Sequence, residues 1–296
     1  MSFRGAVLAT RNLVMHWGNE ISRSARNDTR ARPCALMVSA LLFFLFACAP
    51  TPVPRATITL TLIGADAMQP VARILAPAFM KQRPDVAITI QPANSEIGLR
   101  APRESPRVIG MVSRALKPNE ASQFRAVTLA RDGIAVIVHA SNPINAIQRA
   151  QVAQVFAGEV TAWPTGPIAG KSLIVLSRED GSGTRAAFES LAMNGKRVTR
   201  AAVVLSSDKA MVDYVAAHPP AIGYVSAAAL TAKVNALAID DVPILRENVE
   251  SQQYPFTRPF ILVAPLESEL IVNEFLDFAQ SAEAQRMIAE KYARAP

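Results

Sequence analysis

Cysteine and histidine are scarce in this chain of 296 residues. Its two cysteines, Cys34 and Cys48, both lie near the N-terminus, so the rest of the chain can form no disulfide framework and no cysteine-ligated metal site. The three histidines, His16, His139 and His218, show no ligand spacing and provide little general-base capacity. We therefore expect no metal and no cofactor.

Charged residues are also few, at 19% of the chain, while hydrophobic residues make up 50%. This composition excludes a mostly disordered protein and allows a sizeable core. The net charge is +7, but residues 1–47 carry +4 of it, through six arginines against Glu20 and Asp28. The remainder is only mildly basic and has no stripe of Lys and Arg interleaved with aromatics, so we expect no nucleic-acid binding.

Long apolar runs are limited to Ala35–Ala47, whose 13 residues fall short of the roughly 20 that a transmembrane helix needs. The run follows Arg30 and Arg32 and ends before Cys48, which predicts a signal peptide over residues 1–47. The junction resembles a bacterial lipobox, in which the cysteine is lipidated and anchors an extracytoplasmic protein to the membrane. The alternative is a short buried helix followed by a chance cysteine. Residues 48–55 contain three prolines and predict an extended tether.

The body, from about residue 56, alternates strand and helix patterns, as expected of an α/β protein with a largely parallel sheet. Apolar runs rich in β-branched residues predict the strands, which we place at residues 58–63, 86–91, 108–112, 133–139, 172–176, 203–205, 222–225 and 260–264. Segments of helical periodicity predict helices at residues 71–82, 148–156, 185–193, 209–217, 266–279 and 282–293.

The segment Leu176–Phe188 is the most informative for chemistry. A strand ends, a loop containing Gly181 and Gly183 turns, and a helix begins near Ser182. Helix N-termini carry unpaired N–H groups and partial positive charge, and Arg178 can bind an oxyanion with two donors, so this loop can cradle an anion. The alternative is a simple helix cap by Asp180 or Ser182. The residues alone leave both interpretations open.

Two segments match known catalytic motifs only in part. Residues 165–172 end in Gly-Lys-Ser like a P-loop, but Thr165 stands where that motif has glycine, and a strand follows instead of a helix. Asp180 stands where a G-x-S-x-G nucleophile elbow around Ser182 would need glycine. Because no nucleophile and base pair can be named, a hydrolase is disfavoured and we expect no enzyme activity.

Six separated segments resemble the phosphate-binding protein of bacterial phosphate ABC transporters, the PstS-like proteins. They occur in the order of that family, and the resemblance covers about residues 56–294. The six segments are residues 109–116 (IGMVSRAL), 132–144 (DGIAVIVHASNPI), 151–163 (QVAQVFAGEVTAW), 178–185 (REDGSGTR), 221–226 (AIGYVS) and 254–260 (YPFTRPF). The resemblance implies an α/β fold of two lobes, the type II periplasmic-binding-protein fold, with the ligand in a cleft between the lobes.

The chain of such a protein crosses twice between its lobes. By resemblance, residues 132–140 form one crossing and residues 254–260 the other. This implies one lobe of residues 56–132 plus 259–296 and a second lobe of residues 133–258, which together form the domain of residues 56–296.

The resemblance also implies the ligand contacts. In the family, four loops grip phosphate, and the loop at residues 178–184 matches in full, with Asp180 expected to orient Arg178. The residues that carry over as oxyanion ligands are Arg178, Asp180, Ser182, Gly183, Thr184, Ser113, Ser95 and Asn94. Two loops depart from the family. Asp66 and its neighbours replace most hydroxyls of the first, and Pro102 and Pro106 are expected to break the helix after the second.

The function implied is a lipid-anchored, monomeric solute-binding protein that captures phosphate or a related oxyanion for an ABC transporter permease. The alternative is a degenerate paralogue that senses or scaffolds without tight anion binding. The departures in the first two loops keep this alternative open, because each lost charge-assisted hydrogen bond costs about 1.5–3 kcal/mol.

Overall fold

The structure is a computed structural model that describes residues 58–164 and 169–295. The predicted signal peptide, Cys48 and the proline-rich tether lie outside the described residues. None of the described helices is long and apolar enough to cross a membrane.

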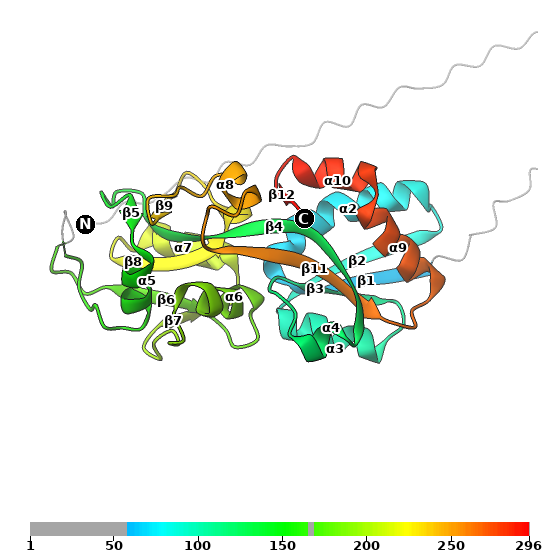
Figure 1. The fold of residues 1–296 in the computed structure, drawn as a ribbon, viewed down its shortest axis with the longest axis horizontal. Helices are drawn as coiled ribbons and strands as arrows, with labels where there is room; N and C mark the ends of the chain where they lie inside the picture. Colours follow the sequence, from blue (N-terminus) through cyan, green and yellow to red (C-terminus); the bar gives the residue numbers. More distant parts are fainter. Residues whose placement is uncertain (1–57, 165–168, 296) are drawn as a thin grey trace, which may run out of the picture. The chain divides into compact units, whose positions relative to one another are not determined.

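The order of elements follows the predicted alternation of strands and helices (Figure 1). The strands are β1 (Ile58–Ala65), β2 (Val86–Ala93), β3 (Val108–Val112), β4 (Phe124–His139), β5 (Ala146–Ile147), β6 (Ile174–Arg178), β7 (Val203–Leu205), β8 (Ala221–Ser226), β9 (Val234–Ala236), β10 (Ala238–Ile239), β11 (Thr257–Pro265) and β12 (Ala293–Arg294). The helices are η2 (Asp66–Met68), α2 (Gln69–Gln82), α3 (Ser95–Glu104), α4 (Pro118–Ala121), α5 (Arg149–Phe156), α6 (Gly183–Ala192), α7 (Asp208–Ala217), η3 (Ala227–Ala229), α8 (Arg246–Glu250), α9 (Leu270–Gln280) and α10 (Ala282–Ala289).

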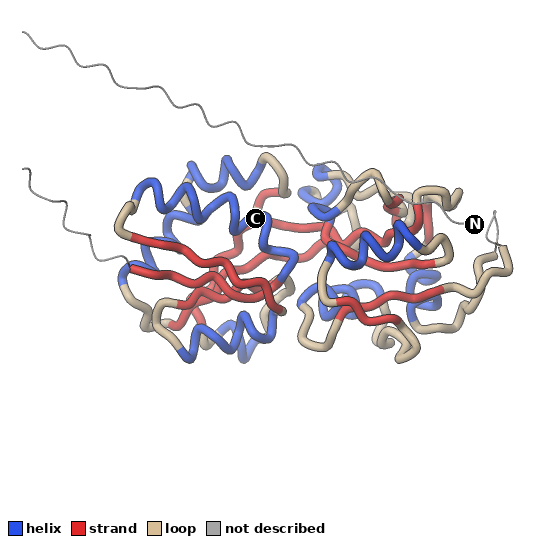
Figure 2. The backbone as a smooth tube through the Cα atoms, turned by 180° about the vertical axis from the view of Figure 1, so that it is seen from behind, coloured by secondary structure: helices blue, strands red, loops and turns tan. Residues whose placement is uncertain are grey.

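Two lobes meet along the long strand β4: lobe 1 contains β1, β2, β3 and β11, and lobe 2 contains β6, β7 and β8. Its first part, residues 124–133, pairs antiparallel with β11 in a sheet of order β2-β1-β3-β11-β4. Its second part, residues 134–138, pairs antiparallel with β8, which continues to β6 and β7. The hydrogen-bonded path is therefore continuous through β4, and the sheet is mixed where a largely parallel one was expected. The fold is the predicted two-lobed α/β type, with β4 and β11 as the crossing strands (Figures 1 and 2).

Both faces of each sheet are covered, which explains the nearly continuous apolar runs of its strands. In lobe 1, alternate residues of β11 enter different clusters: Phe260 and Leu262 pack with α2, α9 and α10, and Ile261 and Val263 pack with α3. In lobe 2, Ile134 and Val136 of β4 pack with α5 and α6, and Ala135 and Ile137 pack with α7. These separate clusters are compatible with the lobe boundaries given above, which we retain as a proposal.

The expectation that prolines break the helix after β2 is wrong. Helix α3 continues to Glu104 with Pro102 inside it, and Pro106 lies beyond its end. Pro102 sits near the last turn, so its missing N–H removes one late hydrogen bond and leaves the start of the helix intact. That start is capped by Asn94, whose Oδ1 accepts from the N–H of Ile97 at 3.0 Å. The N-terminus of α3 is therefore preserved, and it lies beside the loop that precedes α6, where the N–H of Glu96 donates to the carbonyl oxygen of Gly181 at 3.3 Å.

Candidate functional site

Residues from both lobes converge on the N-terminus of α6. A Cβ atom at Gly183 would lie 2.0 Å from Ser95 Oγ and 2.6 Å from Ser113 Oγ. Gly183 and Ser182 belong to lobe 2, whereas Ser95 begins α3 and Ser113 follows β3 in lobe 1. The structure therefore brings together Gly183, Ser95 and Ser113, three predicted residues that are up to 88 positions apart in the sequence.

Four buried hydroxyl groups surround this point, and each acts as a hydrogen-bond acceptor toward the protein. Ser95 Oγ accepts from the N–H of Ser113 at 3.1 Å, and Ser182 Oγ accepts from the N–H of Arg185 at 3.3 Å. Thr184 Oγ1 and Ser113 Oγ both accept from Nη1 of Arg258, at 2.7 and 3.4 Å. In the described part of the chain we find no acceptor for the hydroxyl hydrogens. These four hydrogens remain available to a ligand rich in acceptors.

The backbone of the loop before α6 is held by two side chains, those of Tyr224 and Arg185. The N–H of Arg178 donates to Tyr224 Oη at 3.2 Å, and Tyr224 in turn stacks on Phe188 of α6 with ring centroids 4.1 Å apart. Arg185 Nη1 donates to the carbonyl oxygen of Arg178 at 3.1 Å. Because the loop is fixed on both sides, the first N–H groups of α6 point to one place, where their partial positive charge favours an anion.

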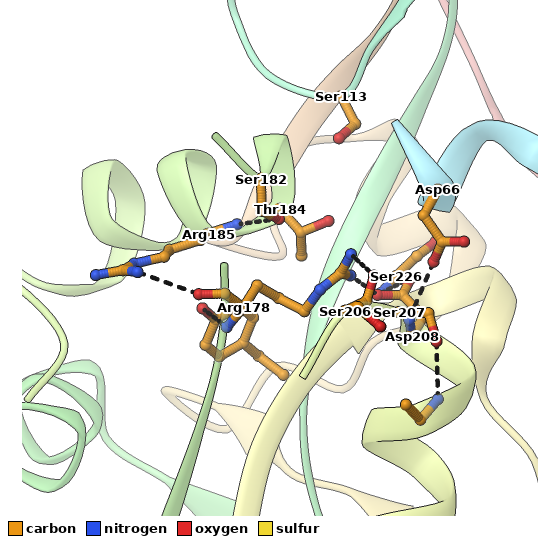
Figure 3. A network of polar contacts seen from close by, with 12 residues as sticks. Asp66, Ser113, Arg178, Ser182, Thr184, Arg185, Ser206, Ser207, Asp208 and Ser226 are labelled. Carbon is orange, nitrogen blue, oxygen red and sulfur yellow. Dashed lines mark hydrogen bonds and ion pairs between the residues drawn. The ribbon is translucent and has the colours of Figure 1, made fainter. Parts of the chain in front are cut away.

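Arg178 is buried, with 2% of its surface exposed, but its orienting partner differs from the expected one (Figure 3). Its Nη1 donates to Asp208 at 2.7 Å, its Nη2 to the carbonyl oxygen of Ser206 at 2.9 Å, and its Nε to Glu179 at 3.2 Å. Asp208, Glu179 and Ser206 therefore orient the guanidinium group. Three of its five N–H hydrogens are used, and two remain for a ligand.

The expected orienting role of Asp180 is wrong. Its side chain is 86% exposed and pairs with Arg185 at 2.8 Å and with Arg197 at 3.7 Å. Gly181, with φ of +85°, turns the backbone just after it, and across that turn Asp180 is exposed while Ser182 is buried. Asn94 also has a structural part, as the cap of α3 and in contact with Gly181.

A buried polar network beneath the hydroxyl groups was not predicted. Arg258 Nε donates to Asp132 at 3.0 Å, and these two residues face each other across the crossing strands. Asp132 accepts from Ser226 Oγ at 2.9 Å, and the N–H of Ser226 donates to Asp208 at 3.1 Å. Two Arg–Asp pairs are thus joined through Ser226, and Arg258 touches hydroxyl groups of both lobes. The sequence did contain one signal for this network. Asp132 directly precedes the apolar run at residues 133–139, and a charge buried there requires a partner.

Asp66, one of the residues that replace the hydroxyls of the first loop, has a partner in the other lobe. Its Oδ2 accepts from the N–H of Asp208 at 3.1 Å, and its Oδ1 accepts from Gln69 Nε2 at 2.7 Å. Asp208 opens α7, so the carboxylate lies at a helix N-terminus, where negative charge is stabilised. Asp66 therefore joins the lobes at the edge of the site.

The buried carboxyl groups of the network have perturbed acidities. Burial raises the pKa of Asp132 to about 6, and the Arg258 guanidinium offsets part of this rise. Burial also raises the pKa of Asp208, against the lowering effect of Arg178. Both carboxyl groups therefore bind protons more tightly in the folded than in the unfolded chain.

We expect stability to depend on the titration of Asp132. Because its folded pKa exceeds its usual value of 3.8, the stabilisation is complete below pH 3.8 and is lost as pH rises through about 6. Over this pH range the free energy of unfolding should fall by about 3 kcal/mol, at about 1.4 kcal/mol per pKa unit. Urea unfolding of the ligand-free chain and of Asp132→Asn from pH 4 to 7 measures it. Parallel pH profiles for the two proteins would contradict the assignment.

Chemically, the site offers hydroxyl and backbone donors together with one oriented arginine, and its two buried Arg–Asp pairs cancel in charge. In the described residues, no group of three His, Cys, Asp or Glu side chains is placed to hold a metal ion. Such a donor set suits a tetrahedral oxyanion held mainly by dipoles.

Comparison with known proteins agrees with this chemistry. A model described as a PBP superfamily domain matches residues 49–283. The phosphate-binding protein PstS of Bacillus subtilis (strain 168) is 29% identical over 238 residues, covering 79% of each chain.

Two solved structures are similar over 80% of this chain and 100% of their own. One, assigned as a phosphate ABC transporter substrate-binding protein of Clostridium perfringens and solved with bound phosphate, has a TM-score of 0.75 at 32% identity. The other, an ABC-type phosphate transport receptor from Vibrio cholerae, has a TM-score of 0.68 at 27% identity. The chain therefore belongs to the PBP superfamily and, within it, to the PstS-like phosphate-binding proteins.

Proposed function

We propose that this protein binds inorganic phosphate in the cleft between its lobes and delivers it to an ABC transporter permease. The observation that carries the proposal is the set of four buried hydroxyl groups, Ser95, Ser113, Ser182 and Thr184, that accept from the protein and keep their hydrogens free. Together with the N-terminus of α6 and Arg178, they supply donors from both lobes to one ligand. The donor set matches the four oxygens of phosphate.

The charges around the site favour an anion that still carries a proton. The pairs Arg178–Asp208 and Arg258–Asp132 cancel, and Asp66 and Glu179 add negative charge at the edge. A carboxylate can accept a hydrogen bond from a protonated phosphate oxygen, whereas sulfate carries no proton at neutral pH. We therefore expect phosphate to bind more tightly than sulfate.

Calorimetric titration of the full chain tests this function. One phosphate should bind per chain, with much weaker binding of sulfate, and phosphate at 100 times its dissociation constant should stabilise the fold by about 2.7 kcal/mol. Neither heat nor stabilisation at millimolar phosphate would contradict the proposal and favour the sensor or scaffold alternative.

We further propose that the mature protein is a monomer without enzyme activity, held outside the cytoplasm by lipid on Cys48. The short apolar run before Cys48 and the proline-rich residues 48–55 support this anchor. Mass spectrometry of membrane-extracted protein should find an N-terminal peptide that begins at an acylated Cys48. A mature chain that retains residues 1–47 would rule this out.

A further inference from the structure

Two adjoining cavities lie at the hinge, apart from the hydroxyl groups of the cleft. One, of about 180 Å³, is lined by both lobes: Asp132, Ala228 and Arg246 contribute to it, and so does Tyr292. The other, of about 300 Å³, lies beside Ala289 and Arg294. Both include Arg246 and Tyr292 in their walls. Figure 1 shows α8 and β12 on the same side of the crossing strands, and α8 packs against both β12 and β4.

Four cations line these cavities, and none of them pairs with a carboxylate within the described residues. Arg131 and Arg246 donate only to carbonyl oxygens, those of Glu250 and Ala289. Lys291 and Arg294 line the cavities without any such contact. Among the other described residues, most basic side chains lie within 4.0 Å of a carboxylate. The hinge cavities are therefore bordered by positive charge that no described carboxylate neutralises in an ion pair.

Two carboxyl groups also lie here, and they offset little of this charge. Asp132 lines the smaller cavity, but its oxygens already accept from Arg258 and Ser226, so its charge is balanced. Glu250 is exposed and lines the larger cavity together with two cations, Arg246 and Arg294. The balance of charge in the two cavities therefore remains positive.

A buried hydroxyl group adds a second and independent observation. Tyr292 is 3% exposed and lines both cavities, yet its Oη has no hydrogen-bond partner in the described structure. Its ring is held against Phe260, with centroids 5.6 Å apart. Leaving a buried hydroxyl without a partner costs about 1–3 kcal/mol. An acceptor that reached Tyr292 Oη from the cavities would remove this cost.

We propose that the hinge cavities form a second anion site, for a small oxyanion with several negative charges such as pyrophosphate. Arg131, Arg246, Lys291 and Arg294 would neutralise it, and Tyr292 Oη would donate a hydrogen bond. Two joined tetrahedral groups suit two adjoining cavities that share Arg246 and Tyr292. Arg246 belongs to lobe 2 and the other ligands to lobe 1 or its crossing strand, so the bound anion contacts both lobes.

Calorimetry with pyrophosphate tests this site. The full chain and its cleft variant Gly183→Ala should bind pyrophosphate with equal affinity, because the cleft is not involved. The double variant Arg246→Ala/Lys291→Ala should lose at least about tenfold in affinity, at about 1.4 kcal/mol per decade. The control Arg100→Ala/Lys196→Ala removes the same charge from exposed positions that line neither cavity, and it should change affinity less than twofold. Equal losses in both double variants would indicate diffuse attraction and overturn the proposal.

The variant Tyr292→Phe tests whether Tyr292 Oη binds the anion. If Tyr292 Oη binds the anion, this variant loses several-fold in pyrophosphate affinity while its thermal stability is kept or raised. If affinity is unchanged and only stability rises, the hydroxyl takes no part and the proposed site is wrong. The titration with phosphate is separate: wild-type chain that binds pyrophosphate but not phosphate would refute the proposed function and leave this site standing.

Discussion

Replacing Arg178 with alanine should weaken phosphate binding by about 30- to 4,000-fold. Truncating one partner of a buried charge pair typically costs about 2–5 kcal/mol, at about 1.4 kcal/mol per tenfold change. Arg178 is 2% exposed and donates to Asp208 and Glu179. Its removal would leave both carboxylates beside the ligand without a cation, in addition to deleting two free donors. Calorimetric titration with phosphate at low salt measures the loss.

Three further variants identify the origin of the affinity lost in Arg178→Ala. In Arg178→Ala/Asp208→Asn, the buried carboxylate is gone as well, so part of the affinity should return. Ser113→Ala removes one hydroxyl group and should cost nearer to about 1 kcal/mol. Arg197→Ala removes an arginine whose side chain is 72% exposed, and it should leave the affinity unchanged. If Arg178→Ala binds phosphate as tightly as the wild-type chain, Arg178 is not a ligand.

The sequence predicted most elements of the lobes because their strands are buried on both faces and read as unbroken apolar runs. The first part of β4, residues 124–132, was missed. There Arg125 and Arg131 interrupt the pattern, and the strand is defined mainly by its pairing with β11. Such pairing joins segments that are more than 120 positions apart, and local propensity carries no information about it.

The same reason separates the predicted from the unpredicted parts of the site. The loop at residues 178–184 is local, so its glycines, hydroxyl residues and arginine could be interpreted together. The network of Asp132, Asp208 and Arg258 depends on contacts across 18 to 145 positions. Even so, Arg258 and Asp132 lay inside segments that resembled the family. Because a buried charge requires a neutralising partner, the two opposite charges in these segments indicate a pair between Arg258 and Asp132.

Replacing Gly183 with alanine should abolish most phosphate affinity without weakening the fold of lobe 2. The added Cβ would lie 2.0 Å from Ser95 Oγ and 2.6 Å from Ser113 Oγ, closer than non-bonded atoms approach. Either the serines rotate out of the site, or the start of α6 moves away from lobe 1. Both outcomes remove at least two hydrogen bonds from serine hydroxyl groups to phosphate, each worth about 1 kcal/mol, so we expect a loss of at least about 30-fold.

For the stability of helix α6 itself, alanine at position 183 is more favourable than glycine. Gly183 is the first residue of α6, where alanine favours the helix over glycine by less than the roughly 1 kcal/mol of a helix interior, so Gly183→Ala should unfold at about the same temperature as the wild-type chain. Gly195 provides the matched control. Its φ of +82° makes alanine strained, although no atom lies within 4 Å of an added Cβ. Gly195→Ala should therefore lose stability and keep its phosphate affinity. If Gly183→Ala retains wild-type affinity, the cleft does not close on phosphate at the start of α6, and the ligand must be held elsewhere.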